Sequence, residues 1–176
     1  MFSDPEKNIK QFSVGEDWRL ADFGTGSGAY ALAAGEMITE GQVYAIDVNP
    51  RLLSRLETDA REKRIYSVKT LSGDIERAGG VPLADGSMDG VIAANVFFQV
   101  DNKEGLVKEI RRVMRKKGRV LVVDWSGSHG GIGPHGNHVV SKERVEKLFE
   151  ENGFLFEQTI DAGAHHYGVI FKKEEM

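Results

Sequence analysis

The chain has 176 residues, of which 40% are hydrophobic and 28% charged, values that are typical of one folded domain and exclude a largely disordered chain. The formal net charge of -4 excludes a general electrostatic attraction to nucleic acid, and the absence of cysteine excludes disulfide bonds and thiolate metal sites. The first residues lack the pattern of a secretory signal, and the longest apolar run, 91–98, is far shorter than the about 20 residues that span a bilayer. We therefore expect a cytoplasmic, single-domain protein with no membrane partner.

Segments typical of strands and of helices alternate along most of the chain. The predicted strands cover residues 18–23, 42–47, 65–71, 88–93, 119–124, 154–160 and 166–172. The predicted helices cover residues 4–14, 29–38, a segment that opens at Asn49-Pro50, 103–114 and 142–151. Only a short connection joins the last two strands, so they should pair antiparallel. This order predicts an α/β fold in which helices cover both faces of a mostly parallel sheet.

A glycine-rich turn connects the first predicted strand to the following helix. It reads Asp22-Phe23-Gly24-Thr25-Gly26-Ser27-Gly28, and three alternating glycines exceed what a tight turn requires. Glycines let a ligand approach the backbone without a β-carbon in the way, so we expect this turn to bind a ligand. The spacing Gly24-x-Gly26-x-x-Ala29, with Asp47 farther along the chain, also satisfies a loose dinucleotide fingerprint.

Three features favour a ligand with a methionine moiety over a dinucleotide. The carboxylate of Asp22, two residues before the first glycine, could meet an amino group but would repel a pyrophosphate. A second acidic residue, Asp74, follows the third predicted strand and could accept a hydrogen bond from an adenine amino group. The third feature is the antiparallel pair of strands that ends the chain.

With these motifs the sequence resembles class I S-adenosylmethionine-dependent methyltransferases. The family's first motif matches the glycine turn, its ribose-binding acidic residue matches Asp47, and its Gly-Asp element near adenine matches Gly73-Asp74-Ile75. Residues 87–95 and 117–124 match its fourth-strand and fifth-strand elements. The resemblance implies a Rossmann-like, doubly wound, seven-stranded sheet in a three-layer α/β/α arrangement with an antiparallel C-terminal strand, and S-adenosylmethionine as the cofactor that becomes S-adenosylhomocysteine. The implied cofactor-binding residues are Asp22, Phe23, Gly24, Thr25, Gly26, Gly28, Asp47, Val48, Gly73, Asp74, Ile75 and Asn95.

The class of acceptor is indicated less directly. The chain looks most similar to the small-molecule branch that includes quinone-biosynthesis C-methyltransferases, and its first motif is also similar to that of transfer-RNA adenine methyltransferases. However, Asn95-Val96-Phe97-Phe98 lacks the two prolines of amino-methylating nucleic-acid enzymes. We therefore expect methyl transfer to a small molecule by in-line displacement, catalysed mainly by positioning. The alternatives are an RNA or protein methyltransferase and a non-catalytic binding module that needs a partner subunit; a nicotinamide oxidoreductase is least favoured.

Candidate acceptor-side residues lie beyond the fourth and fifth strands and at the start of the last strand. The catalytic candidates are His129, His165 and Tyr167, since histidine titrates near neutral pH and could act as a base. The substrate-binding candidates are Phe97, Phe98, Trp125, His135, His138 and His166. The alternatives are solvated loop histidines and aromatic residues that pack in the core. Solvated histidines are also commoner than a zinc site at this spacing, so no metal is predicted.

Four segments of the domain have different expected roles. A helical segment, 1–16, lies over the cofactor; 17–125 forms the cofactor-binding core; 126–140 is a lid loop rich in glycine and histidine; and 141–176 forms a helix and the terminal hairpin. A run of cations within 111–119 is interpreted as the solvated end of a helix, with an RNA-binding patch as the alternative. We expect a monomer or a homodimer.

Overall fold

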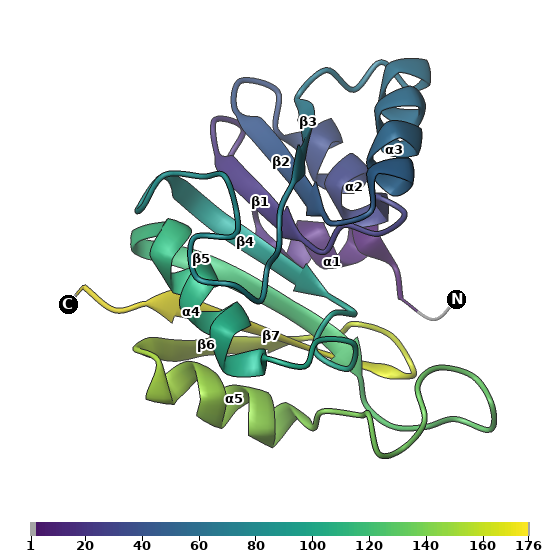
Figure 1. Cartoon of the computed structure of the whole chain (residues 1–176), viewed down its shortest axis with the longest axis vertical. Helices are drawn as coiled ribbons and strands as arrows, with labels where there is room; N and C mark the ends of the chain where they lie inside the picture. The colour runs from purple at the N-terminus through teal and green to yellow at the C-terminus, as the bar shows by residue number, and fades with distance from the viewer. Residues whose placement is uncertain (1–2, 176) are drawn as a thin grey trace.

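The structure is a computed structural model that describes residues 3–175 and contains one seven-stranded sheet (Figure 1). Residues 1, 2 and 176, at the ends of the predicted first and last segments, lie outside the described range. The helices are α1 (Pro5–Phe12), α2 (Ala29–Met37), α3 (Pro50–Glu62), α4 (Lys103–Val113) and α5 (Lys142–Glu151). The strands are β1 (Arg19–Phe23), β2 (Gln42–Asp47), β3 (Val68–Ser72), β4 (Met88–Ala94), β5 (Met114–Trp125), β6 (Phe154–Ile160) and β7 (His166–Lys173). Across residues 3–175, no helix combines the length and apolarity needed to cross a membrane.

The strand order in the sheet is β3-β2-β1-β4-β5-β7-β6. The first five of these strands pair in parallel, whereas β7 pairs antiparallel with β5 on one side and with β6 on the other. The chain builds outward from β1 to β3 and then returns to add β4 on the opposite side of β1. Open α/β sheets bind ligands at such a reversal, outside the carboxyl ends of the strands. The predicted fold is confirmed, including the antiparallel C-terminal strand.

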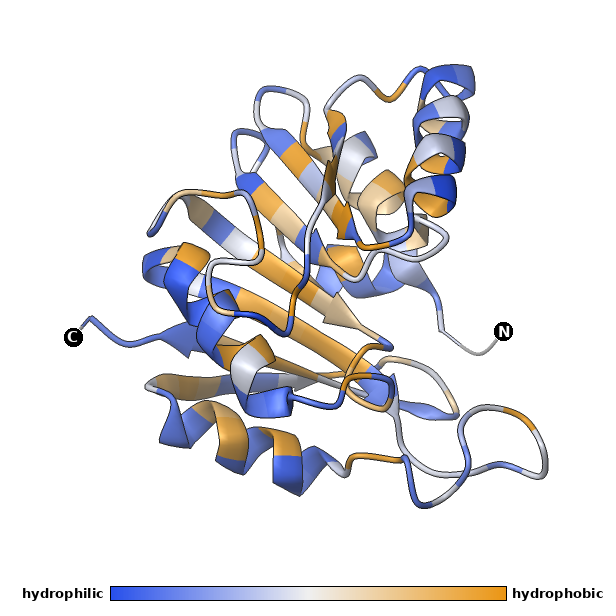
Figure 2. Cartoon of the chain, in the orientation of Figure 1, coloured by the Kyte–Doolittle hydropathy of each residue, from blue (hydrophilic) through white to orange (hydrophobic). Residues whose placement is uncertain are grey.

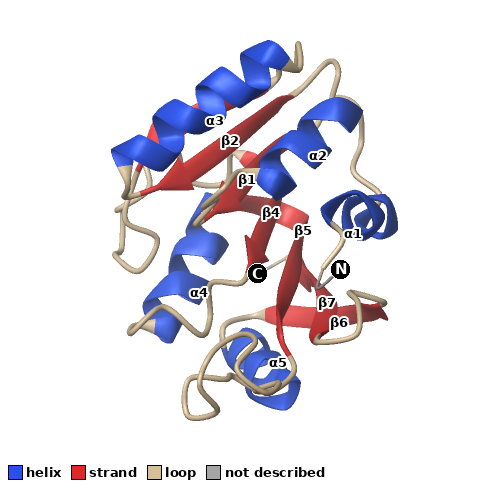
Figure 3. Ribbon diagram, turned by 90° about the vertical axis from the view of Figure 1, so that its right-hand side faces the viewer, coloured by secondary structure: helices blue, strands red, loops and turns tan. Residues whose placement is uncertain are grey.

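Helices cover both faces of the sheet, as the two ribbon views show (Figure 1 and Figure 3). α1, α2 and α3 pack on one face around buried Phe12, Ala31 and Leu56. α4 and α5 pack on the other face around Ile110 and Phe149. Apolar residues follow the strands, while the helices alternate apolar and polar residues along their length (Figure 2). Burial of this apolar surface is the main force that holds the three layers together.

Polar side chains determine where four of the helices begin. At α1 an oxygen of Asp4 accepts a hydrogen bond from the backbone N–H of Lys7, 3.1 Å away. Asn49, Asn102 and Ser141 cap α3, α4 and α5 in the same way. Because each cap satisfies a donor that the helix leaves without an internal partner, these helices begin at defined positions.

Two strands differ from their predicted limits by more than one residue. β3 begins at Val68, because the backbone N–H of Ile65 donates to the carbonyl of Ala60 and so completes the end of α3. β5 begins earlier than predicted, at Met114, which pairs with Met88 of β4 before the register shifts. At β3 a local hydrogen bond at the helix end, and at β5 a tertiary pairing, overrides the pattern of apolar residues.

Candidate functional site

The glycine loop lies between β1 and α2 at the carboxyl edge of the parallel strands. Gly24, Gly26 and Gly28 have φ angles of 70°, 54° and 80°. A Cβ atom on Gly24 would lie 2.7 Å from Val96 Cγ1, and one on Gly28 would lie 2.3 Å from Leu56 Cδ1. At Gly26, by contrast, the nearest atom would be the Gly24 carbonyl oxygen, 4.0 Å away. The outer two glycines are therefore needed for packing, whereas Gly26 borders open space in front of the loop.

The end of β2 is hydrogen-bonded directly to this loop. Asp47 accepts a hydrogen bond from the backbone N–H of Gly26 at 3.0 Å through Oδ2, and from that of Asn49 at 3.0 Å through Oδ1. The backbone N–H of Thr25 also donates to the carbonyl of Ile46, at 2.8 Å. Each carboxylate oxygen has a second lone pair, so Asp47 can still accept from ligand hydroxyls. This arrangement fits the predicted role of Asp47 toward a ribose.

A cavity of about 370 Å³ opens in front of the glycine loop. Its wall combines the loop, the segment that leads into α1, the start of α2 and the carboxyl-edge ends of β4, β5 and β7. The lining residues are Ser3, Pro5, Gly24, Thr25, Gly26, Ser27, Ala29, Tyr30, Ala94, Asn95, Gln99, Trp125 and His166. Four predicted cofactor-binding residues thus meet Trp125 and His166, which were predicted to contact the acceptor.

Asp22 lies beneath the loop and outside the lining of this cavity. It is 2% exposed, and its Oδ2 accepts from the Thr25 hydroxyl at 2.6 Å. Burial raises the pKa of Asp22 to about 6, although the hydrogen bonds from Thr25 and from the Ala31 backbone act in the opposite direction. Phe23 is fully buried in the core beside it. In the structure Asp22 holds the loop in place through its hydrogen bond with Thr25. Its contact with a ligand amino group stays a prediction.

The remaining predicted cofactor residues surround the loop. Gly73 donates its N–H to the Asp47 carbonyl at 3.2 Å, and a Cβ on Gly24 would lie 3.3 Å from Ile75 Cδ1. Asp74 is exposed and accepts from the backbone N–H of Glu76 at 3.0 Å. Val48, which follows Asp47, is 67% exposed. Ile75 thus lies beside Gly24 in the cavity wall and Gly73 beside Asp47, but Val48, Gly73, Asp74 and Ile75, like Asp47, do not line the cavity itself.

Asn95 connects the ends of three strands. It has a φ of 57°, and its backbone N–H donates to the Val123 carbonyl at 2.7 Å. Its Oδ1 lies 3.0 Å from His166 Nε2, within hydrogen-bond distance. The His166 ring in turn packs against Trp125, with ring centroids 4.4 Å apart. This polar and aromatic cluster forms the wall of the cavity opposite α2.

Asp124, which was not predicted as a site residue, supports the site from below. It is fully buried at the end of β5 and accepts hydrogen bonds from the backbone N–H groups of Phe97 at 2.9 Å and Trp125 at 2.8 Å. Burial raises its pKa to about 6, against the effect of these backbone bonds. Asp124 therefore fixes the turn that carries Asn95. The only sequence signal was an acidic residue directly after an apolar strand.

The raised pKa of Asp22 leads to a testable pH dependence of stability. A carboxyl whose pKa is higher in the folded state contributes stability that is complete below about pH 4 and is lost as the pH rises through about 6. We expect the free energy of unfolding of the wild-type protein, relative to Asp22→Asn, to fall by up to about 3 kcal/mol between pH 4 and pH 7. Urea unfolding of both proteins across this range measures the difference. A constant difference would contradict the prediction.

Two predicted acceptor-side residues lie in the core instead. The Tyr167 hydroxyl is buried and donates to the Val140 carbonyl at 2.9 Å, and burial raises its pKa. Because adjacent residues of a strand point to opposite faces, His166 faces the cavity and Tyr167 faces away from it. Phe97 is fully buried, with its ring centroid 6.0 Å from that of Phe149. Contrary to the predicted positions, the structure places both side chains away from the cofactor cavity: the Tyr167 hydroxyl is anchored at Val140, and Phe97 packs in the core.

The loop at 126–140 does not cover the glycine loop. Figure 1 shows it projecting away from the sheet, and its expected role as a lid stays a prediction. The ring of His129 packs on that of His165, with centroids 4.3 Å apart, and neither residue lines the 370 Å³ cavity. His135 is exposed, and its ring centroid lies 6.5 Å from that of His138. Over residues 3–175, no group of three or more acidic or histidine side chains could hold a metal ion.

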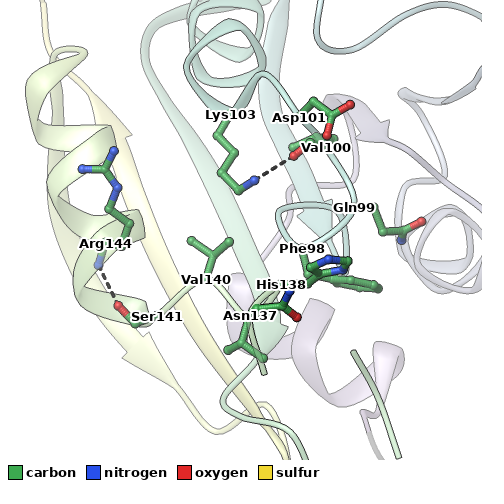
Figure 4. A pocket seen from close by; sticks show the side chains of 11 residues that line it. Phe98, Gln99, Val100, Asp101, Lys103, Asn137, His138, Val140, Ser141 and Arg144 are labelled. Carbon is green, nitrogen blue, oxygen red and sulfur yellow. Dashed lines mark hydrogen bonds between the residues drawn. The ribbon is translucent and has the colours of Figure 1, made fainter. Parts of the chain in front are cut away.

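A second cavity, of about 710 Å³, adjoins the first (Figure 4). Gln99 lines both cavities, and its side-chain amide donates to the Asn95 carbonyl at 2.6 Å. Phe98 and His138, both predicted to bind the acceptor, line this second cavity. Its other walls are the start of α4 and the segment that leads into α5. The two cavities meet at the carboxyl edge of the sheet, where β4 ends.

Comparison with known proteins identifies relatives that share these features. A family model described as "Methyltransferase domain" matches residues 21–122. An arsenite methyltransferase from Halobacterium salinarum is 31% identical over 60% of this chain and 26% of its own length. A ubiquinone/menaquinone biosynthesis C-methyltransferase from Paraburkholderia phymatum is 30% identical over 67% of this chain and 47% of its own length. The chain thus spans between about a quarter and a half of these curated relatives.

A solved structure agrees over nearly the whole chain. A SAM-dependent methyltransferase from Aquifex aeolicus superposes with a TM-score of 0.87 and 26% sequence identity, covering 97% of this chain and 90% of that protein. The family model covers more than half of the chain and includes the glycine loop, Asp47 and Asn95. The chain belongs to the class I S-adenosylmethionine-dependent methyltransferase family.

Proposed function

We propose that this chain transfers a methyl group from S-adenosylmethionine to a small-molecule acceptor. The observation that carries the proposal is the pair of adjoining cavities, one in front of the glycine loop and one beyond Gln99. The first is lined by Gly24, Thr25, Gly26 and Asn95, which match the family's cofactor motifs. The second, at about 710 Å³, lies within the roughly 300–1,000 Å³ range of small-molecule sites.

The residues around the loop fit the cofactor chemically. Gly26 leaves open space where a ligand can approach the backbone, and Asp47 offers carboxylate lone pairs beside it. When bound, S-adenosylmethionine supplies a methyl group attached to a positively charged sulfur. Transfer of the methyl group leaves this sulfur as a neutral thioether. The chain's own contribution is to hold the acceptor in line with that methyl group and to exclude water. Asn95, Trp125 and His166 line the first cavity together with Gln99, which the two cavities share, and suit this positioning role.

The location of the cations also supports a small acceptor over RNA. Arg111, Arg112, Arg115 and Lys116 line a separate hollow near the start of β5, at the edge of the sheet opposite the glycine loop. A nucleic acid bound there would not bring a base to the cofactor cavity. Two relatives, named for arsenite and for ubiquinone or menaquinone, are methyltransferases of small acceptors.

Calorimetric titration with S-adenosylmethionine, S-adenosylhomocysteine and NAD tests the proposal. We expect the first two to bind with micromolar affinity. In Asp47→Ala the affinity for each should fall by at least about 100-fold, equivalent to about 2.7 kcal/mol of binding free energy. Asp85→Ala is the control, because Asp85 is exposed and lies at the opposite edge of the sheet. Binding of NAD alone would overturn the proposal, and binding of none of the three would favour a module that depends on a partner.

A further inference from the structure

The larger cavity has a cationic wall built by two helices. Lys103 is the first residue of α4, and Arg144 lies in the first turn of α5 (Figure 4). Within residues 3–175, neither side chain takes part in an ion pair, unlike Lys108 and Lys147 on the same two helices. The Lys103 ammonium donates to the Val100 carbonyl at 2.7 Å, which leaves two of its three N–H groups for another acceptor.

One acidic side chain also lines this cavity. Asp101 is exposed and directs its carboxylate away from the Lys103 ammonium (Figure 4). The lining contains two cations, Lys103 and Arg144, and one anion, Asp101, so its formal charge is one positive unit. The amino-terminal ends of α4 and α5 border the same cavity and add a potential of the same sign. Lys103 and Arg144 also line a neighbouring hollow with Glu104 and Glu151, but those two carboxylates pair with Lys108 and Lys147. The lining of the larger cavity is thus positive in a chain whose net charge is -4.

The rest of the cavity wall is apolar or neutral. Val100 and Val140 are buried, and the ring of Phe98 is partly exposed beside them. Asn137 and His138 add hydrogen-bonding groups at the end of the 126–140 segment. A ligand that fills this cavity therefore meets an apolar surface at one side and cations at the other. An amphipathic molecule with one negative charge matches both.

We infer that the acceptor is a small apolar acid whose carboxylate binds Lys103 and Arg144, with its body extending along Phe98 toward Gln99. The inference rests on the proposed function, because Gln99 is where this cavity meets the cofactor cavity. A carboxylate forms ion pairs with both cations, whereas a neutral ligand of the same shape accepts hydrogen bonds from them without contributing a negative charge. The carboxylate thus fixes which end of the acceptor faces the cofactor.

The test uses two ligands that differ in charge and hardly in shape, 1-naphthoate and 1-naphthamide. Each is titrated into the whole chain, saturated with S-adenosylhomocysteine, while backbone amide shifts are followed by NMR. We expect 1-naphthoate to bind at least about tenfold more tightly, with the largest shifts in residues 98–100 and 139–141. Arg144→Gln and Lys103→Gln should each remove most of this preference. Lys147→Gln is the matched control on α5, and it should leave the preference unchanged.

Each outcome distinguishes the inference from the function on which it rests. Equal affinity for the two ligands, shifts confined to other residues, or full preference in both Arg144→Gln and Lys103→Gln would overturn the inference. If S-adenosylhomocysteine still binds in that case, the proposed function stands with a neutral acceptor. If S-adenosylhomocysteine does not bind but 1-naphthoate is still preferred, the anion site stands and the proposed function fails. Circular-dichroism melting of each variant checks that it is folded.

Discussion

Replacing Arg112 with alanine is expected to lower the free energy of unfolding by about 3–5 kcal/mol. The guanidinium donates to both carboxylate oxygens of Glu109, at 2.9 Å and 2.6 Å, and to the carbonyls of Val81 and Leu83. Glu109 is 1% exposed and also accepts from the backbone N–H groups of Gly79 and Val81. Burial alone would raise the pKa of Glu109, but the bonds from Arg112 and from these backbone groups lower it. Without Arg112 the buried carboxylate loses its countercharge.

Urea unfolding of Arg112→Ala measures this effect. Arg115→Ala is the matched control, because the side chain of Arg115 is 58% exposed and pairs with Asp89 at 2.9 Å. A surface pair of this kind contributes up to about 1 kcal/mol. A double variant, Glu109→Leu with Arg112→Met, should recover part of the loss by removing both charges, while the backbone N–H groups of Gly79 and Val81 lose their acceptor. Equal effects of Arg112→Ala and Arg115→Ala would contradict the prediction.

Gly26→Ala is expected to weaken S-adenosylmethionine binding by at least about 100-fold. The new methyl group would meet no protein atom closer than 4.0 Å and would stand in open space at the wall of the cofactor cavity. The left-handed backbone, with φ of 54°, costs an alanine roughly 1–2 kcal/mol. The variant should therefore stay folded while the ligand loses its approach to the backbone. Calorimetric titration measures the loss of affinity, and thermal melting measures the loss of stability, so the two effects are separated.

Gly86→Ala provides the control for backbone strain. Gly86 has a φ of 62°, a Cβ there would meet nothing within 4 Å, and it lies at the opposite edge of the sheet. Its alanine variant should lose similar stability and keep wild-type affinity. If Gly26→Ala also keeps wild-type affinity, the ligand does not approach the loop at this position.

The parts of the fold and site that sequence reasoning predicted depend on local signals. Alternating strand and helix patterns follow from periodicity, and the short connection before β7 predicted its antiparallel pairing, which the structure confirms. The glycine loop is a continuous motif, and the loop and Asp47 meet because parallel strands end at one edge of the sheet. A contact between residues distant in the chain is predictable where the fold class alone brings two strand ends together.

The parts that were missed depend on the path of the chain in three dimensions. A strand sends adjacent residues to opposite faces, but the sequence does not say whether His166 or Tyr167 faces the cavity. The basic run was interpreted as a solvated helix end, yet Arg112 is held by Glu109, whose burial depends on the loop around Gly79. Asp124 binds backbone groups that only the folded turn presents to it. Such partners are created by tertiary packing and leave no periodic signal.

The position of β7 between β5 and β6 affects the order in which the protein can mature during synthesis. β7 is the last strand of the described chain, yet it covers the edge of β5 and supplies His166 to the cofactor cavity. A nascent chain that has emerged only as far as β6 leaves the apolar β5 edge open to other strands. We expect the cavity to be completed only when nearly all of the described chain has left the ribosome. Truncated products should be prone to aggregate through that edge and unable to bind the cofactor.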